Sequence, residues 1–213
     1  MGQNKKKSPT SDGTYHHGDL RNALLEAALA ILQSEGLNGL SLRKVASAAG
    51  VSHGAPYRHF ESKESLIAEI ARIGFQGLAD FGQRQIRKHQ TARDRLLGYG
   101  LGYVLFAAEH PTHFKIMFGS TDLQLENYPE LAKTSRYTFD LLVELVVDCQ
   151  KENSIQSGDP YELAAVNWSY VHGLSHLLIE KKLHWLTATK GNRAMATSIW
   201  KKLDHYLIDG MGP

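Results

Sequence analysis

Cysteine is almost absent from this sequence, and its scarcity excludes several kinds of site. Cys149 is the only cysteine among the 213 residues. A single thiol cannot form a disulfide within the chain or complete a zinc site built from several cysteines. No residue near it in the sequence would activate a thiolate, so we expect Cys149 to be a small apolar residue of the core.

Long apolar runs and a strong charge of either sign are lacking as well. No stretch approaches the roughly 18 apolar residues that a membrane-spanning helix needs, and the N-terminus is polar. We therefore expect a cytoplasmic protein with no signal peptide and no membrane partner. The net charge is only +2, yet residues 1–60 carry seven lysines and arginines against four acidic residues. A modest positive charge gathered in this part of the chain suits contacts with phosphate, which are mainly electrostatic.

The two-residue alternation typical of β-strands is not found, whereas the 3.6-residue period of helices recurs along the chain. We therefore predict an all-α fold. Asp19 is placed to cap a first helix that ends at Glu35 and Gly36. Further helices are predicted over residues 41–49, 52–60, 62–87, 91–109, 113–118, 128–152, 160–184 and 193–208.

The most informative stretch runs from Ser41 to Phe60. Ser41 can cap a helix whose apolar positions recur at helical spacing, and Gly50 can end that helix in a left-handed conformation. Ser52 can cap a second short helix that ends at Phe60, and Pro56 limits its length because proline lacks an N–H. Two short helices across a glycine turn describe a helix-turn-helix, whose second helix enters the major groove of DNA. The same corner also occurs in folds that bind no nucleic acid.

The residues around this corner extend the pattern. Leu40-Ser41-Leu42-Arg43 opens the first of the two helices, Ala49-Gly50-Val51-Ser52 forms the turn, and Tyr57-Arg58-His59-Phe60 closes the second. Phe60-Glu61-Ser62-Lys63-Glu64-Ser65-Leu66 then opens the next helix. Together these runs closely resemble the helix-turn-helix of the TetR (tetracycline repressor) family of bacterial transcription regulators.

A sparser resemblance covers the second half of the chain. Trp168-x-x-x-His172-Gly173 and His110-Pro111-x-x-Phe114-x-x-Met117-Phe118 look like the WHG-type C-terminal domain found in one branch of TetR regulators. The resemblance implies an all-α homodimer, usually a repressor. Such a repressor leaves a pseudo-palindromic operator in double-stranded DNA when a small molecule enters the C-terminal bundle.

The DNA contacts of the family carry over onto the matching positions. Tyr57, His59 and Lys63 are expected to hold phosphates. Base readout is expected from Arg43, His53, Gly54 and Arg58, since arginine is the best partner for guanine edges. The complete expected set is Arg21, Ser41, Arg43, Ser52, His53, Gly54, Pro56, Tyr57, Arg58, His59 and Lys63.

Three parts are expected along the chain. Residues 1–14 contain lysine, serine and glycine without an apolar period, which predicts a disordered basic tail. Residues 15–75 are expected to form the helix-turn-helix DNA-binding domain, and residues 76–213 the ligand-binding and dimerisation domain. The boundary is placed within the helix over 62–87, where Gly74 and Gly77 each lower helix stability by about 1 kcal/mol relative to alanine and could let the helix bend.

Dimerisation is predicted through the last two long helices. Residues 160–184 carry an apolar arc wider than one packing face, which implies burial on two sides. One side can close the subunit's own bundle, and the other can meet a second subunit together with residues 193–208. We expect a charge at Leu174 or Leu203 to dissociate the dimer.

The effector is expected to be largely apolar or aromatic, because the candidate pocket residues are aromatic or soft. Packed helical bundles use the same residue types in their cores, so the two roles overlap. The candidates for ligand binding are Tyr99, Tyr103, Phe106, Phe114, Met117, Phe118, Tyr137, Trp168 and His172.

Two other functions are weighed against a regulator. One is a metal- or base-dependent helical enzyme, whose candidate bases are His110, His113 and His172. The other is a helical dimer adaptor without DNA binding, which the matching DNA contacts disfavour. His172, His176 and His184, with Glu180 between them, are spaced by four residues, so neighbours could share a metal, but a core histidine beside a solvated stripe explains them better. Phosphate loops, nucleophile elbows and H-E-x-x-H are not found, so we expect no metal and no cofactor.

Overall fold

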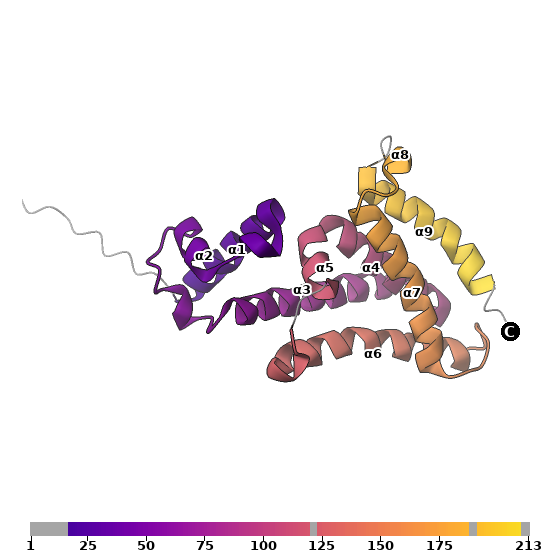
Figure 1. The fold of residues 1–213 in the computed structure, drawn as a ribbon. Helices are drawn as coiled ribbons and strands as arrows, with labels where there is room; N and C mark the ends of the chain where they lie inside the picture. Colours follow the sequence, from indigo (N-terminus) through magenta and orange to yellow (C-terminus); the bar gives the residue numbers. More distant parts are fainter. Residues whose placement is uncertain (1–16, 120–122, 188–190, 210–213) are drawn as a thin grey trace, which may run out of the picture. The chain divides into compact units, whose positions relative to one another are not determined.

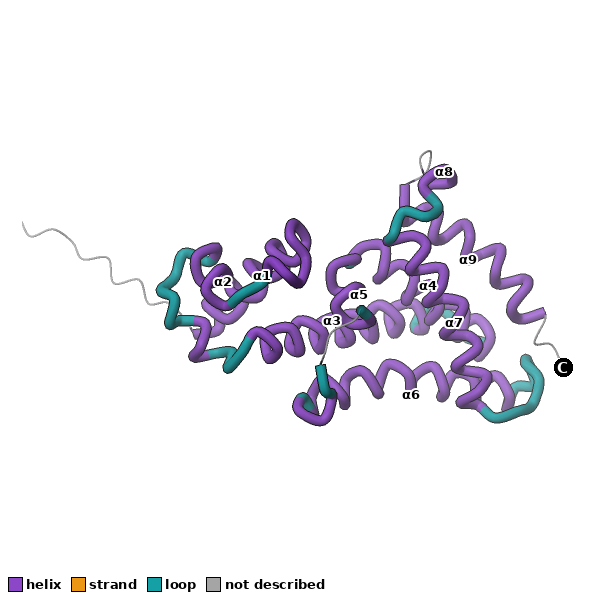
Figure 2. Tube along the Cα trace, in the orientation of Figure 1, coloured by secondary structure: helices purple, strands orange, loops and turns teal. Residues whose placement is uncertain are grey.

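The computed structural model describes residues 17–119, 123–187 and 191–209, and every regular element within those ranges is helical (Figures 1 and 2). The prediction of an all-α fold is confirmed. The predicted tail over residues 1–14 lies outside the described residues. The chain divides into two compact units, Met1–Ser62 and Lys63–Pro213. The division falls thirteen residues before the boundary predicted at residue 75, which lies inside a continuous helix.

The first unit contains α1 (His17–Gly39), α2 (Leu42–Ala48) and the short 3-10 helix η1 (Pro56–Arg58). The backbone of α1 is helical from residue 17, so Asp19 lies inside the helix and the prediction that it caps the helix is wrong. Helical geometry breaks at Gly36, where φ is +69°, which confirms the predicted end. The apolar side chains buried in this unit are Leu24, Leu25, Ala28, Ile31, Leu32, Leu40, Leu42, Val45, Ala46 and Phe60.

Both predicted ends of α2 are confirmed. The Ser41 side chain accepts a hydrogen bond from the N–H of Lys44 at 3.2 Å, as an N-cap does. At the other end Gly50 has a φ of +69°. The N–H of Val51 then reaches the carbonyl of Ala46 at 3.0 Å, a bond that closes helices ending in a left-handed residue.

The segment after Gly50 is tighter than the helix predicted over residues 52–60. Only Pro56–Arg58 forms a helical element, and it is a 3-10 turn. Pro56 has no N–H, so it cannot form the bond to the carbonyl of Ser52 that a longer α-helix would require. The N–H of Ala55 takes that carbonyl instead at 2.9 Å. The Pro56 and Phe60 side chains are buried and fix this segment to the rest of the unit.

The second unit is a helical bundle organised around one central helix. That helix, α4, packs against α3, α5, α6, α7 and α9. The elements of the unit are α3 (Lys63–Ile86), α4 (Ala92–Glu109), α5 (Pro111–Phe118), η2 (Leu125–Asn127), α6 (Pro129–Lys151), α7 (Pro160–Ile179), α8 (His184–Thr187) and α9 (Gly191–Asp209).

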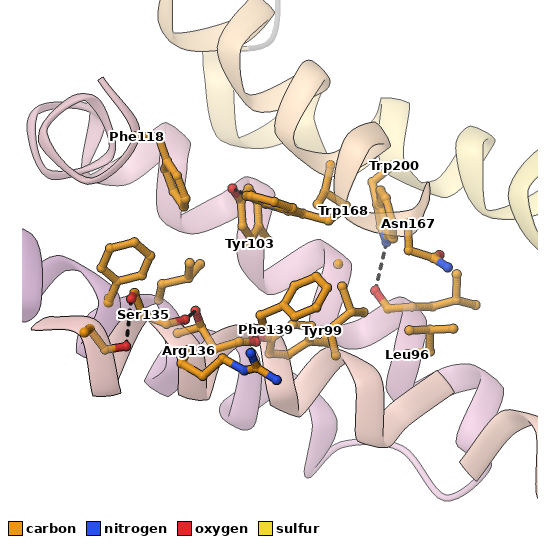
Figure 3. Close-up of a pocket in the computed structure, with 18 of the residues that line it drawn as sticks. Leu96, Tyr99, Tyr103, Phe118, Ser135, Arg136, Phe139, Asn167, Trp168 and Trp200 are labelled. Carbon is orange, nitrogen blue, oxygen red and sulfur yellow. Dashed lines mark hydrogen bonds between the residues drawn. The ribbon is translucent and has the colours of Figure 1, made fainter. Parts of the chain in front are cut away.

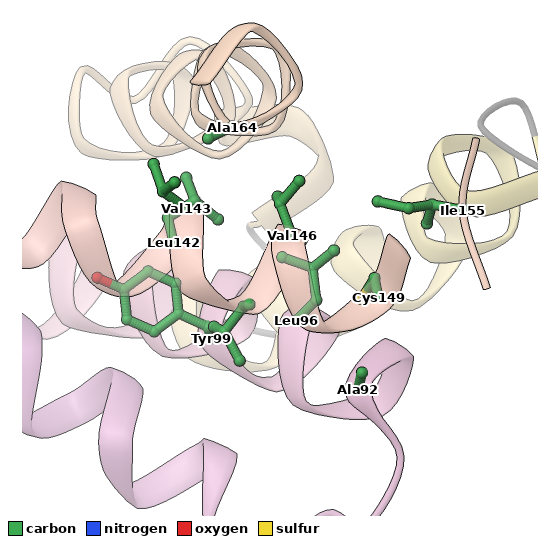
Figure 4. Packing of buried hydrophobic residues seen from close by; sticks show 10 residues of the cluster. Ala92, Leu96, Tyr99, Leu142, Val143, Val146, Cys149, Ile155 and Ala164 are labelled. Atoms are coloured by element: carbon green, nitrogen blue, oxygen red, sulfur yellow. The ribbon is translucent and has the colours of Figure 1, made fainter. Parts of the chain in front are cut away.

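A buried apolar cluster joins α4, α6 and α7 (Figure 4). Tyr99 and Leu96 of α4 lie in the same cluster as Val146 of α6 and Ala164 of α7. Cys149 belongs to it and is fully buried, so the expectation of a core cysteine is confirmed. Burial also raises the pKa of the Cys149 thiol, which keeps it in the unreactive protonated form at neutral pH.

The glycines of α3 have a packing role. The helix is continuous from Lys63 to Ile86. A Cβ added at Gly74 would lie 2.5 Å from the sulfur of Met117, and one at Gly77 would lie 3.0 Å from the ring of Phe106. These glycines therefore let α5 and α4 approach α3 closely, a demand that the sequence alone did not reveal.

The end of α7 comes earlier than predicted. The predicted helix continues to residue 184, but Lys181 adopts a φ of +54°. The N–H of Lys181 bonds the carbonyl of Leu178 at 3.1 Å, and the N–H of Lys182 bonds that of Leu177 at 2.9 Å. This pair of bonds ends a helix at a left-handed residue, a place usually taken by glycine and here by lysine.

The two sides of α7 differ sharply in exposure. Leu174 is only 6% exposed within its own subunit. A charge there would disrupt the subunit's own bundle, so this substitution cannot report on the dimer alone, and its predicted effect on the dimer stays a prediction. The side chain of Leu203, the other predicted site, lies outside the described residues. The large side chains that α7 leaves exposed are Tyr161, Val166, Tyr170 and Leu177.

Candidate DNA interface and effector cavity

Most side chains predicted to contact DNA lie on the surface of the first unit. Tyr57 is 54% exposed, while Pro56 beside it is buried and serves as an anchor. Pro56 and Phe60 are the buried residues of this turn, and its polar side chains consequently point outward. The predicted residues of this segment with exposed side chains are Ser41, Arg43, Ser52, His53, Tyr57 and Arg58.

His53 is tied to the preceding helix. Its Nε2 atom lies 3.2 Å from the Oγ atom of Ser47, and that hydroxyl donates its own hydrogen to the carbonyl of Arg43 at 3.1 Å. Because its hydrogen is used in this way, the Ser47 oxygen is left able to accept a hydrogen from His53 Nε2. The imidazole that is expected to read a base is thus oriented by α2.

Gly54 is a glycine that its own unit does not require. Its φ is not positive, and a Cβ added there would meet no atom within 4 Å. Gly50, in contrast, needs glycine because of its left-handed backbone. The lack of a side chain at Gly54 leaves room on the outer surface for another molecule to approach the backbone.

The two cations of α2 have different surroundings. Lys44 forms an ion pair with Glu35 of α1. Arg43 is exposed and pairs with no acidic residue in the described part of the chain. Arg43 therefore offers its guanidinium to a partner outside the subunit, whereas Lys44 is partly neutralised.

Three further predicted contacts have different surroundings. The guanidinium of Arg21 lies 5.6 Å from the centre of the Phe60 ring. His59 is half-buried, and its Nε2 atom is enclosed without a hydrogen-bond partner among the described residues. A phosphate contact from His59 would need Nδ1 or a rotation of the ring. Lys63 is the first residue of α3 and belongs to the second unit.

The second unit contains a cavity of about 400 Å³ (Figure 3). This volume is within the range of small-molecule sites, roughly 300–1,000 Å³. The wall is mainly apolar and aromatic. Its residues are Phe75, Leu78, Leu96, Leu97, Tyr99, Gly100, Tyr103, Phe118, Leu125, Ala132, Ser135, Arg136, Thr138, Phe139, Leu142, Asn167, Trp168, Val171 and Trp200.

The cavity brings together four of the predicted ligand residues. Tyr99, Tyr103, Phe118 and Trp168 line its wall. The other five lie outside it: Phe106 and Phe114 are buried in the bundle, Met117 packs against Gly74, Tyr137 is exposed and bonded by Gln83, and His172 lies behind Tyr103.

Several wall residues had no signal in the sequence. Trp200 comes from α9, about a hundred residues after Leu97, whose carbonyl accepts its indole N–H at 3.0 Å. Arg136 and Ser135 are polar residues on α6 that residue type alone would place on the surface. Only the packing of α6 and α9 around α4 assigns these three side chains to the cavity.

A chain of hydrogen bonds crosses the wall from Trp168 to His172. The indole N–H of Trp168 donates to the Tyr103 oxygen at 3.1 Å. That oxygen lies 2.7 Å from Nδ1 of His172. Burial raises the pKa of Tyr103, and burial together with neighbouring His176 lowers the pKa of His172. At neutral pH the Tyr103 hydroxyl therefore donates to an unprotonated Nδ1.

Rings pack densely behind this chain. Phe114 is fully buried, and its ring centre lies 5.6 Å from that of Tyr103 and 4.9 Å from that of Phe118. His172 and His176 both lie 5.5 Å from Phe114. Phe114 is thus the centre of the aromatic layer that supports one side of the cavity.

The alternatives to a regulator gain no support. In the part of the chain that the structure describes, no group of three or more His, Cys, Asp and Glu side chains is placed to hold a metal ion. Within the same residues, no helix is long and apolar enough to cross a membrane.

A helix-turn-helix unit followed by a helical bundle with a ligand-sized cavity defines a class of protein, the small-molecule-responsive transcription regulators. Two family profiles match separate stretches of the chain: "Bacterial regulatory proteins, tetR family" over residues 24–70 and "Tetracyclin repressor-like, C-terminal domain" over residues 96–197. The chain belongs to the TetR family. Proteins of this family are regulators rather than enzymes, and the resemblance of the second half to the WHG-type domain is confirmed.

Individual relatives agree with this assignment. The transcriptional repressor KstR2 of Rhodococcus jostii is 39% identical over 64 residues, which are 30% of this chain and 31% of that protein. The repressor KstR of Mycobacterium tuberculosis is 26% identical over 206 residues, covering 90% of this chain and 80% of that protein. A Rhodococcus protein of unknown function has a solved structure with a TM-score of 0.78 and 28% identity, covering 95% of this chain and all of that one. Several of the curated matches cover less than a third of this chain and less than a third of the relative's own length.

Proposed function

We propose that this chain is a dimeric transcriptional repressor that leaves a pseudo-palindromic operator when a small apolar or aromatic effector fills the cavity of its second unit. The observation that carries the proposal is the exposed turn of the first unit. It places hydrogen-bond donors on both sides of Gly54, a glycine that the fold itself does not need. The cavity supplies the place for an effector.

The DNA-facing residues divide into two roles. Tyr57, His59 and Lys63 hold phosphates, and such contacts fix position without reading sequence. Arg43 and His53 reach base edges together with Gly54 and Arg58, and the arginines prefer guanine. Arg21, Ser41, Ser52 and Pro56 complete the interface from its edges.

Substitutions should separate reading from positioning. Arg43→Ala should lower the preference for operator over random DNA by about 1–3 kcal/mol, because it removes a base contact. Tyr57→Phe and Lys63→Ala should weaken both DNAs by similar factors, and Lys63→Ala should also lower the slope of log affinity against log salt by about one. Gel shifts with the upstream region of the protein's own gene, at several salt concentrations, measure all three.

Lys44→Ala is the matched control for Arg43→Ala. It removes a neighbouring exposed cation of the same helix, but one that Glu35 already pairs. Its effect on operator preference should be small. Equal loss of preference from Arg43→Ala, Tyr57→Phe and Lys63→Ala would refute the division of roles.

The dimer surface is assigned to the outer stripe of α7. Val166, Tyr170 and Leu177 are 46%, 47% and 45% exposed and follow one another at helical spacing. Gly173 lies between them, and a Cβ added there would meet nothing within 4 Å. An apolar stripe with a glycine at its centre suits close packing against the same stripe of a second subunit, with α9 alongside. The inner side of α7 meanwhile closes the subunit's own bundle.

The effector acts through α5 and α3. Phe118 of α5 lines the cavity, and its ring lies 5.3 Å from that of Phe75 on α3. A molecule in the cavity would displace Phe118 and press α5 against α3, which begins at Lys63. DNA fixes two recognition elements roughly 34–36 Å apart, so a shift of a few ångströms disfavours the complex.

This coupling must be reciprocal. The affinity of any effector should fall about 5–150-fold when saturating operator is added, and operator affinity should fall by the same factor when effector is added. Titrations followed by the fluorescence of Trp168 and Trp200, which line the cavity, measure the first arm. Gly74→Ala, which forces Met117 away, should change the coupling factor. Effector affinities that are identical with and without DNA would rule out this mechanism.

A further inference from the structure

The hydroxyl and indole donors of the cavity wall are already used within the protein. The Tyr99 hydroxyl donates to the carbonyl of Thr138 at 2.5 Å. The indole N–H groups of Trp168 and Trp200 donate to Tyr103 and to a main-chain carbonyl, as described above. The wall therefore offers these groups to a ligand only as apolar ring surface.

Three uncharged polar side chains of α6 and α7 on the wall are likewise bonded within the protein. Ser135 Oγ donates to the carbonyl of Ala132 at 3.0 Å, and Thr138 Oγ1 donates to the carbonyl of Ser135 at 2.6 Å. The Asn167 amide donates to the carbonyl of Leu163 at 2.8 Å. A ligand carboxylate placed deep among these groups would lose its water without gaining a comparable donor, which is costly. The part of the ligand inside the cavity is therefore hydrocarbon or aromatic.

One charged residue stands at the edge of this wall. Arg136 is the only Asp, Glu, Lys or Arg among the described lining residues, and its side chain is 62% exposed. Leu125, also on the wall, is 45% exposed. The remaining described wall residues are buried or half-buried. The cavity therefore meets solvent where Arg136 and Leu125 lie.

Arg136 is held in place at this opening. Its Nε donates to Asp140 at 2.7 Å, and its guanidinium carbon lies 5.8 Å from the centre of the Tyr161 ring. The bond to Asp140 uses one of the five N–H donors of the guanidinium. The planar fork of arginine matches a carboxylate with two parallel hydrogen bonds, and fixing the side chain beforehand lowers the entropy cost of binding.

We propose that the effector is an amphipathic monocarboxylate, with its hydrocarbon or ring body in the cavity and its carboxylate on Arg136 at the opening. The inference rests on the proposed function for the cavity's role and adds the chemical class of the ligand. Asp140 already offsets part of the charge of Arg136, so the opening suits a ligand with one negative charge far better than phosphates and other polyanions. Alkyl and fused-ring acids share this chemistry.

The test compares ligands that differ in charge but not in body. Decanoate, decanol and anthracene-9-carboxylate are titrated into the full-length protein by calorimetry without DNA. Arg136→Gln should lower the affinity for whichever carboxylate binds by about tenfold. The affinity for decanol should stay within about twofold of the wild-type value. Lys133→Gln removes an exposed cation one turn away that does not line the cavity, and should change neither. Tighter binding of decanoate than of the ring acid identifies an alkyl effector, and the reverse order identifies a ring acid.

A second variant keeps the result decisive if Arg136→Gln is poorly folded. Asp140→Asn removes the side-chain carboxylate that competes for Arg136. It should raise the affinity for the carboxylate ligand several-fold and leave the affinity for decanol unchanged. Equal losses for decanoate and decanol in Arg136→Gln, or no binding of either acid to the wild type, would overturn the proposal. A wild type that binds operator but neither acid refutes the ligand class alone, whereas a wild type that binds no operator refutes the proposed function.

Discussion

Leu177→Glu should convert the protein from dimers into monomers and weaken operator binding by roughly 10²- to 10⁴-fold. The substitution places a charge at the C-terminal end of the exposed stripe of α7, where the proposed dimer would bury it against its own copy. A monomer carries one DNA-binding unit, so it loses the gain that comes from linking two units on one operator. Sedimentation measures the first effect, and gel shifts at fixed salt measure the second.

Ala165→Glu provides the matched control for Leu177→Glu. Ala165 is exposed on the same helix but lies outside the stripe of Val166, Tyr170 and Leu177. The same added charge there should leave a dimer that binds operator. A wild type that sediments as a monomer at micromolar concentration would contradict the proposed surface outright.

Phe114→Ala should lower the free energy of unfolding by about 3–5 kcal/mol. Phe114 is fully buried, and its ring contacts those of Tyr103, Phe118, His172 and His176, so truncation leaves a cavity with little room to collapse. Denaturation of wild type and variant at one protein concentration measures the change, since dimers gain stability with concentration.

Phe114→Leu keeps most of the buried volume and should cost clearly less than Phe114→Ala. If the alanine variant unfolded at the wild-type denaturant concentration, the ring layer would not be a stabilising core. Because Phe114 lies outside the cavity wall, the loss should be one of stability for the whole bundle, whereas a wall residue would change effector affinity first.

The helices were predictable because their signals are local. Ser41 caps α2, Gly50 ends it and Thr91 caps α4 through its own side chain, each within a few residues of its partner. The 3-10 turn at Pro56 was only partly predicted. The missing N–H of proline predicts a short helix, but it does not predict that the Ser52 carbonyl will accept its hydrogen bond from Ala55. The end of α7 was missed because lysine rarely adopts the left-handed backbone that Lys181 has.

The cavity was less predictable than the DNA interface for a physical reason. All of the predicted DNA contacts except Arg21 lie between Ser41 and Lys63, so their order in the chain largely sets their order in space. The cavity wall combines side chains from α3, α4, α5, α6, α7 and α9, and only their packing decides which aromatic ring faces inward. By residue type alone, Phe114 and Phe118 were equal candidates for binding the effector. In the structure Phe114 fills the core, whereas Phe118 lines the cavity wall.

The burial of Cys149 has a practical consequence for measuring the motion proposed above. Its thiol is enclosed in the α4–α6–α7 cluster, and burial raises its pKa, so maleimide and methanethiosulfonate reagents should not label it in the folded protein. One cysteine introduced on an exposed position of α1 or α2 would then be the sole attachment point for a spin label. In a symmetric dimer each molecule would hold one pair of labels. Pulsed electron–electron double resonance could therefore measure the distance between the two labels, and so between the two DNA-binding units, with and without effector and in an otherwise unmodified protein.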